Sequence, residues 1–331
     1  MKPDVTLRPH FEEVRYMYIF GGELWSSGFN DTIQVTDTNL QSTNALNYVN
    51  ITGSSVIVNK EYIVYRSSNN RLYIFKIGTN VAIIKYIGYD ISTMSSYKDG
   101  IIIASHNSTL QLIGLEDLTK STVNNDNPIM ITHINHRIWE MTAADNIICC
   151  ALANNNIEIW NTDNNSCITL CGHKKWITCL VIHKHVLWSS SSDNTIRRWD
   201  ITNNGECLQV IQDHKGYTRA LNEWRNGVCS GSWDQTVIIW NSNGVKLRSI
   251  SVESLVMSII VHDKDIYVGA MGGNIMLYKN AIIEVDTLKD ICSRVIIKYN
   301  IPFYGIRESF NTLIEPILPQ ELVDLLETYK V

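Results

Sequence analysis

The sequence predicts an all-β repeat fold followed by a short α-helical tail. Three observations support this: an internal repeat of 41 residues, many short strand-like segments separated by Asn- and Gly-rich turns, and a final stretch whose apolar residues follow a helical period. Repeats of about 20–50 residues are typical of solenoids, propellers and arrays. One repeat domain can therefore absorb most of the 331 residues.

The composition is that of an ordinary globular protein, with 45% hydrophobic and 18% charged residues. The net charge of −5 gives no indication of a nucleic-acid or membrane partner. The N-terminal segment has no signal-peptide pattern, so we expect a cytoplasmic or nuclear protein. The eight cysteines include no CxxC pair, and we expect them to be reduced and buried, with no metal and no cofactor.

The repeat is clearest between residues 171–200 and 212–241. His173 and His214 are 41 residues apart, and so are Trp199 and Trp240. In each unit the His precedes one strand, and a second strand ends in SSSSD or SGSWD. A tight turn follows, and a third strand closes on Trp-Asp or Trp-Asn.

This pattern resembles WD40 repeats, in which each unit forms one four-stranded blade of a β-propeller. The resemblance implies a buried polar tetrad in which Asp holds the imidazole, the imidazole reaches a Ser hydroxyl and the Ser reaches the indole N–H. We expect these side chains to be structural and not catalytic. The two tetrads are His173, Ser189, Asp193 and Trp199 in one repeat, and His214, Ser230, Asp234 and Trp240 in the next.

Weaker repeats extend the pattern to a seven-bladed propeller over residues 1–286. Their spacing is 38–47 residues, and the positions equivalent to the closing Trp are Thr36, Phe75, Ile113, Trp160, Trp199, Trp240 and Tyr278. Asn or Gly replaces the turn Asp in the weaker blades, and we expect the His to be lost with it, because a half-satisfied network is worse than none. Either Val5–Leu7 or residues 281–285 would supply the strand that closes the ring.

The resemblance also indicates where a ligand would bind. In WD40 propellers the top face is lined by the start of each innermost strand and by the residue before the turn. Trp139 and Met141 are expected at these strand positions in blade four, matching Trp176 and Thr178 in blade five. Aromatic residues and Arg dominate binding hot spots. The candidate surface for a protein substrate consists of Trp139, Trp176, Tyr217, Arg219 and Trp233.

Two alternatives to this docking surface remain open. Trp139 and Trp176 could pack between blades and be mainly structural. An enzyme is the other alternative, but the sequence contains no phosphate-binding loop, dinucleotide fingerprint, nucleophile elbow or HExxH helix, so we expect no catalytic activity.

The tail, residues 287–331, is predicted to be helical. In DTLKDICSRVIIKYN the apolar residues recur at a helical spacing, and Thr287 with Asp290 resembles a capping box. A second helix is expected from about Pro319. The stretch from Thr287 resembles the elongin-binding part of a SOCS box, and the chain as a whole resembles WD-repeat proteins that end in one. The residues that this resemblance assigns to adaptor binding are Leu288, Cys292, Ile296, Leu318 and Pro319.

That resemblance implies a substrate receptor of a ubiquitin ligase built from elongin B/C, a cullin and a RING protein. The sequence departs from the family at Leu318-Pro319-Gln320-Glu321, where Leu-Pro-aliphatic-Pro is usual, and LPQELVDLL also resembles the opening of an F-box. The sequence therefore does not decide which cullin and which adaptor would bind. The other interpretation is a non-catalytic WD40 scaffold of another complex, with the tail packed on the propeller.

Overall fold

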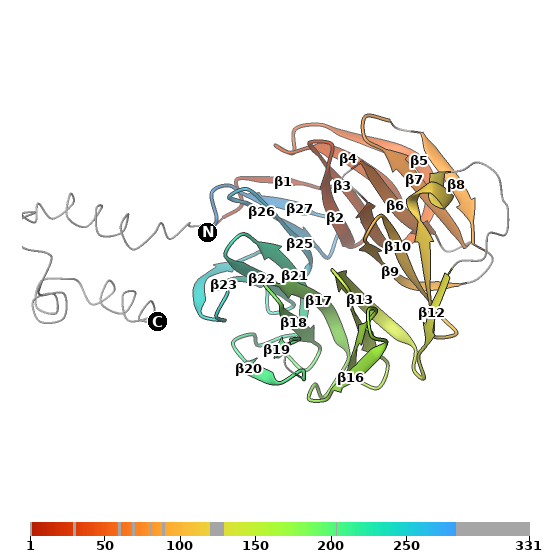
Figure 1. The fold of residues 1–331 in the computed structure, drawn as a ribbon. Helices are drawn as coiled ribbons and strands as arrows, with labels where there is room; N and C mark the ends of the chain where they lie inside the picture. Colours follow the sequence, from red (N-terminus) through yellow and green to blue (C-terminus); the bar gives the residue numbers. More distant parts are fainter. Residues whose placement is uncertain are drawn as a thin grey trace, which may run out of the picture. The chain divides into compact units, whose positions relative to one another are not determined.

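The protein is an all-β, seven-bladed β-propeller. The computed structural model describes residues 2–28, 31–58, 61–67, 70–79, 81–87, 90–119, 129–202 and 204–282. The predictions for the tail lie outside this range, including the boundary at 286/287, the helices and the residues Leu288, Cys292, Ile296, Leu318 and Pro319. Within the described part, the sheets are arranged as a ring around a central axis (Figure 1).

Each blade is an antiparallel meander that runs from the centre of the ring outward. Blade one contains β2 (Val14–Phe20), β3 (Glu23–Gly28), β4 (Asp31–Asp37) and the first half of β5 (Thr43–Val58). Blade two contains the second half of β5, β6 (Tyr62–Ser67), β7 (Arg71–Lys76) and β8 (Ala82–Tyr86). Blade three contains β9 (Ile91–Tyr97), β10 (Gly100–Ser105), β11 (Thr109–Gly114) and β12 (Ile129–His133), with the short helix α1 (Leu115–Thr119) after β11.

The remaining four blades follow the same order. Blade four contains β13 (Ile138–Ala144), β14 (Ile147–Leu152), β15 (Ile157–Asn161) and β16 (Ser166–Leu170). Blade five contains β17 (Ile177–His183), β18 (Val186–Ser191), β19 (Ile196–Asp200) and β20 (Cys207–Ile211). Blade six contains β21 (Thr218–Trp224), β22 (Gly227–Ser232), β23 (Thr236–Asn241) and β24 (Lys246–Ser251). Blade seven contains β25 (Val256–His262), β26 (Asp265–Ala270), β27 (Ile275–Tyr278) and β1 (Val5–Leu7).

The long strand β5 joins the first two blades into one seven-stranded sheet. Its beginning pairs with β4, as Thr43 opposite Thr36 shows, and its end pairs with β6, as Val58 opposite Tyr62 shows. One continuous strand is thus the outer strand of blade one and the inner strand of blade two.

Hydrophobic cores lie between blades and not within them. The described side chains form a cluster at each of the seven blade-to-blade contacts. Successive residues of a strand point to opposite faces, so each blade contributes to two clusters. Cys149 packs in the cluster between blades four and five, while its neighbour Cys150 packs in the cluster between blades three and four.

The positions equivalent to the closing Trp all lie at one place in the third strand of their blades. Each is opposite an aliphatic residue near the start of the second strand, as Leu187 is opposite Trp199 in blade five. The seven pairs are Leu24–Thr36, Ile63–Phe75, Ile101–Ile113, Ile148–Trp160, Leu187–Trp199, Val228–Trp240 and Ile266–Tyr278.

The N-terminal strand closes the ring. β1 is the outer strand of blade seven and pairs antiparallel with β27, with Thr6 opposite Met276. In Figure 1, β1 in red and β27 in blue therefore lie side by side, although they are far apart in the sequence. The backbone N–H of Asp4 donates to the carbonyl of Leu277, and the Asp4 carboxylate accepts from the N–H of Lys279 at 2.7 Å. Of the two closing strands that the sequence left open, the structure uses Val5–Leu7.

The cysteines are less uniformly buried than expected. Cys149, Cys150 and Cys229 are buried, but Cys167, Cys171 and Cys207 are exposed. The exposed cysteines lie on or directly after the outer strands β16 and β20, where no further strand covers the sheet edge. The sequence did not indicate that these cysteines belong to the outermost strands of their blades.

Candidate protein-interaction face

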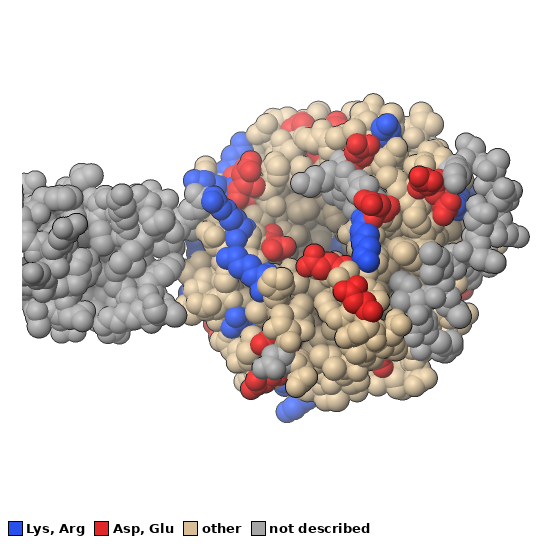
Figure 2. All heavy atoms as spheres, viewed as in Figure 1, with Lys and Arg blue, Asp and Glu red and all other residues tan. Residues whose placement is uncertain are grey.

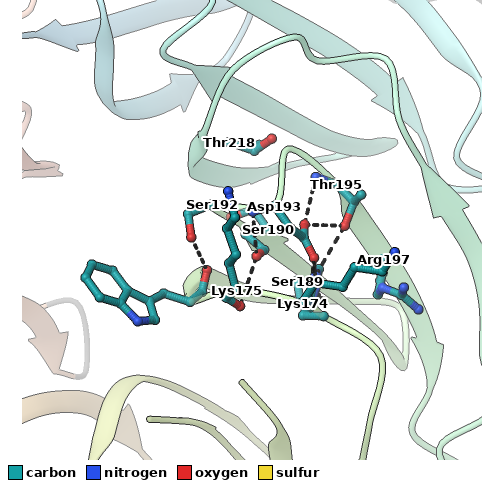
Figure 3. A network of polar contacts seen from close by, with 12 residues as sticks. Lys174, Lys175, Ser189, Ser190, Ser192, Asp193, Thr195, Arg197 and Thr218 are labelled. Carbon is teal, nitrogen blue, oxygen red and sulfur yellow. Dashed lines mark hydrogen bonds and ion pairs between the residues drawn. The ribbon is translucent and has the colours of Figure 1, made fainter. Parts of the chain in front are cut away.

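The tetrad of blade five is assembled as a chain of hydrogen bonds. His173 Nδ1 lies 3.1 Å from Asp193 Oδ2, and His173 Nε2 lies 2.7 Å from the Ser189 hydroxyl oxygen. The indole N–H of Trp199 donates to the same hydroxyl at 2.8 Å. The Ser189 hydroxyl therefore donates to Nε2, and the imidazole Nδ1–H donates to the carboxylate. Figure 3 shows the surroundings of Ser189 and Asp193, with Asp193 and Thr195 turned toward each other.

Blade six repeats the arrangement. His214 Nδ1 lies 2.9 Å from Asp234 Oδ2, His214 Nε2 lies 2.8 Å from the Ser230 hydroxyl, and the Trp240 indole donates to Ser230 at 2.8 Å. Each Asp also accepts a backbone N–H from the loop before the inner strand, that of Lys174 in blade five and Lys215 in blade six, both at 2.8 Å. The tetrads thus connect each turn to the loop that leads into the blade.

The two Asp side chains are held as carboxylates. Burial alone would raise the pKa of Asp193, but the hydrogen bonds from His173, Thr195 and the Lys174 amide outweigh it and hold that pKa well below its usual range. The pKa of Asp234 is lowered in the same way by His214, Thr236 and the Lys215 amide. Every tetrad member has partners within the network, which leaves no exposed His–Ser pair for nucleophilic chemistry there.

Blade one contains a tetrad histidine that the sequence analysis missed. His10 is buried, and its Nε2 lies 2.8 Å from the Ser26 hydroxyl. The expectation that weaker blades lose the His together with the turn Asp is therefore wrong for this blade. His10 could have been identified from its spacing to Ser26. A separation of 16 residues between His and Ser is common to His10–Ser26, His173–Ser189 and His214–Ser230.

A repeated backbone hydrogen bond defines the face on which the loops meet. In blade five the N–H of Ser192, before the turn, donates to the carbonyl of Trp176, before the inner strand, at 2.9 Å. The same bond joins Trp233 to Tyr217 in blade six and Ala153 to Arg137 in blade four. Arg137, Trp176 and Tyr217 thus occupy equivalent places. In each of these blades the residue before the inner strand contacts the residue before the turn.

Trp139 does not occupy the place that the sequence analysis gave it. The inner strands contain a β-bulge near their start, and the bulged residue is Trp139 in blade four, Thr178 in blade five and Arg219 in blade six. Trp139 is therefore equivalent to Thr178 and not to Trp176. The bulge is at the same place in all three blades, so it does not shift one blade against another. The 39-residue spacing of Trp160 and Trp199 already places Arg137, and not Trp139, at the position of Trp176.

Two aromatic pairs nevertheless form on this face. The rings of Trp139 and Trp176 are 6.5 Å apart, and those of Tyr217 and Trp233 are 4.9 Å apart. Trp176 is 67% exposed, Trp139 42% and Tyr217 41%. We call these four residues the aromatic arc. Because Trp139 and Trp176 are exposed, they are not simply packed between blades.

Cations accompany both pairs. The Arg137 guanidinium lies 4.1 Å from the centre of the Trp139 ring, and the Lys175 ammonium lies 5.8 Å from the centre of the Tyr217 ring. Arg137 also donates to His106 Nε2 at 3.1 Å. Burial and the nearby Arg137 charge lower the pKa of His106, so this imidazole is neutral and can accept that bond.

Arg219, the fifth predicted residue, belongs to the wall of the central channel. It donates to the Thr178 carbonyl at 3.2 Å and lines a cavity of about 340 Å³ between the inner strands of six blades. Glu140 lines the same cavity, and burial raises its pKa although Arg219 and Arg66 act in the opposite direction. Figure 2 shows the ring hollowed at its centre, with acidic and basic side chains around the hollow.

The described side chains contain no group of three or more His, Cys, Asp or Glu arranged to hold a metal ion. No helix within the same part of the chain is long and apolar enough to cross a membrane.

Comparison with known proteins agrees with the tetrads. The family model of the WD domain, G-beta repeat, matches residues 164–200 and 205–241, which span most of blades five and six. The fold is a WD40-repeat β-propeller. Among solved structures, the WD40 β-propeller domain of Doa1 is similar with a TM-score of 0.65 over 83% of this chain and 96% of that one, at 19% sequence identity. The computationally designed Ika8 protein is similar with a TM-score of 0.64 at 17% identity.

Curated relatives match only a small part of the WD40 propeller. Nuclear distribution protein PAC1 of Arthroderma benhamiae is 37% identical over 68 residues, which are 20% of this chain and 15% of the relative. Nuclear distribution protein nudF 2 of Penicillium rubens is 29% identical over 102 residues, 30% of this chain and 22% of the relative. The chain thus spans less than a quarter of the length of these relatives.

Proposed function

We propose that this WD40 propeller is a protein-interaction platform that holds a protein partner on the aromatic arc, with Arg219 at its inner edge. The observation that supports this most directly is the exposure of Trp176 and Trp139 as neighbouring rings. Exposed, contiguous aromatic surface is characteristic of interaction sites, and Trp, Tyr and Arg are the commonest hot-spot residues. The platform would act by binding alone, in the cytoplasm or the nucleus.

The test compares the proteins that bind the full chain with those that bind a Trp176→Ala, Tyr217→Ala double variant. Quantitative mass spectrometry of affinity-purified complexes should show specific partners reduced at least about tenfold, since truncating a hot spot costs about 2 kcal/mol or more. Tyr86→Ala is the matched control, because Tyr86 is 58% exposed but lies on the outer strand of blade two. Equal recovery of all partners by the double variant would contradict the proposal.

The sequence of the tail favours a more specific role. TLKDICSRVI and the later Leu318-Pro319 resemble a SOCS box, so the proposal includes recruitment of elongin B/C and a cullin. Leu288 and Cys292 would insert into a groove of the adaptor, a helix-in-groove mode of binding. The propeller would hold a substrate near the ubiquitin-transfer module, and the gain in rate would come from proximity.

Co-purification of the full chain with elongin B/C tests this role. Stoichiometric capture that is lost in a Leu288→Asp, Cys292→Asp variant would support a ligase receptor. Absence of capture by the parent chain would exclude this adaptor. It would not exclude the interaction platform, which the Trp176→Ala, Tyr217→Ala double variant tests separately.

A further inference from the structure

Basic side chains lie beside the aromatic arc. The loops before the inner strands of blades four, five and six contain four cations. Lys174, Lys175 and Lys215 are exposed and Arg137 is half-buried. The equivalent loops of blades seven and one contain exposed acidic residues, Glu253 and Glu12, and the loop of blade one also contains the exposed Arg8. Basic residues therefore predominate in the loops of the blades that hold the aromatic arc, and we call these three loops the basic sector.

The acidic side chains in this sector are already engaged. Asp193 and Asp234 are directed into the tetrads, with side chains only 7% and 12% exposed, and accept the N–H groups of Lys174 and Lys215. Asp213, the exposed carboxylate before His214, pairs with Lys246 at 3.2 Å. Lys174, Lys175 and Lys215 are exposed on this face, whereas the carboxylates of Asp193 and Asp234 are directed into the tetrads.

From this arrangement we infer that the segment bound by the aromatic arc is a short acidic peptide in which apolar residues flank Asp or Glu. The inference rests on the proposed interaction platform and names the class of its ligand. Each aromatic pair has a cation beside it. Arg137 lies over the Trp139 ring of one pair, and Lys175 lies over the Tyr217 ring of the other. Apolar side chains would contact the rings, and carboxylates would pair with the cations between them.

Two further points favour this ligand. Arg137 is held by Trp139 and His106, so it loses little conformational freedom when a carboxylate binds. The chain as a whole has a net charge of −5, which disfavours a long polyanion such as a nucleic acid but not a few acidic residues placed against a local basic sector.

The experiment is a selection of displayed random 12-residue peptides on the immobilised full chain. A selected peptide is then labelled with fluorescein, and its anisotropy is titrated with wild type, with a Lys174→Glu, Lys175→Glu variant and with Trp176→Ala. The charge-matched control is Lys98→Glu, Lys184→Glu, in the turns between β9 and β10 and between β17 and β18. Thermal melting of each variant checks its folding, and Lys175→Ala replaces any charge-reversal variant that does not fold.

We expect the selected peptides to be enriched in Asp and Glu. Their affinity should fall at least about tenfold in the Lys174/Lys175 and Trp176 variants but not in the control, and should weaken as salt rises. Neutral or basic peptides that depend on Trp176 would overturn the acidic ligand while keeping the docking face. Failure to enrich any peptide would overturn the inference, and so would tighter binding of a labelled 12-nucleotide oligouridine than of the selected peptides.

Discussion

His10 Nε2 lies 2.8 Å from the Ser26 hydroxyl oxygen, and this contact ties the chain between the last and first blades to the middle of blade one. β1 ends at Leu7 in blade seven, and β2 begins at Val14 in blade one. His10 therefore anchors the connection that follows ring closure, in the way that His173 and His214 anchor the loops before blades five and six.

Replacement of His10 by Ala should destabilise the propeller by about 1–3 kcal/mol, because the Ser26 hydroxyl would lose a buried partner. Urea denaturation followed by tryptophan fluorescence measures the change. His136→Ala is the control, since His136 is an exposed residue of the loop before blade four. Equal stability of the His10 and His136 variants would show that the contact contributes nothing to ring closure.

Gly273 is the second residue on which this connection depends. It has a φ of +81°, and a Cβ at this position would collide with the backbone carbonyl of His10. Gly272 has a φ of +88° but open space where its Cβ would be. Both Ala variants are strained by their φ, at a cost of roughly 1–2 kcal/mol, so the additional loss in Gly273→Ala reports the collision alone. We expect a lower melting temperature for Gly273→Ala than for Gly272→Ala; the reverse order would contradict the close approach.

Trp240 combines a core contact with a tetrad hydrogen bond. It is 1% exposed and donates to Ser230. Trp240→Ala should cost about 3–5 kcal/mol, since it creates a cavity and leaves a buried hydroxyl short of a partner. Trp176→Ala, at the exposed position, should melt close to the parent. A parent-like melting temperature for Trp240→Ala would mean that blade six is held by other contacts.

Asp193 and Asp234 should make stability fall in acid. Their pKa values in the folded protein are below the value of about 3.9 for an unfolded Asp. The unfolded state then binds more protons, so their contribution is complete at neutral pH and is lost as the pH falls below about 5.

An Asp193→Asn, Asp234→Asn variant should be less stable at pH 7, yet its free energy of unfolding should fall less between pH 6 and pH 3. Urea denaturation at several pH values measures this difference. Asp213→Asn, which removes an exposed carboxylate, serves as the control. A double variant whose pH dependence matched that of the parent would exclude the two tetrads as its source.

The repeat spacing predicted the seven-bladed ring because each unit repeats the same strand, turn and strand. The residues of the two full tetrads could be identified for the same reason: their spacing within one blade fixes which side chains meet. His10 follows the same rule but was missed, because its partner Ser26 lies in a blade that lacks the other motif residues.

Only part of the candidate site could be predicted from the sequence. The sequence indicated Trp139, Trp176, Tyr217, Arg219 and Trp233 as one surface, and the structure divides them into an aromatic arc and a residue of the channel wall. The cations Arg137 and Lys175 were not selected at all. Their role depends on which ring they lie over, and that is set by neighbouring blades.

The sequence by itself determined the all-β repeat, the number of blades and the tetrads of blades five and six, because these depend on local periodicity and short-range spacing. Only the tertiary structure decided that Val5–Leu7 closes the ring, that Trp139 and Trp176 lie next to each other, and that the basic loops of three blades meet at one aromatic surface. These features depend on contacts between residues far apart in the chain, and the physical reason is that each blade buries its faces only against its neighbours.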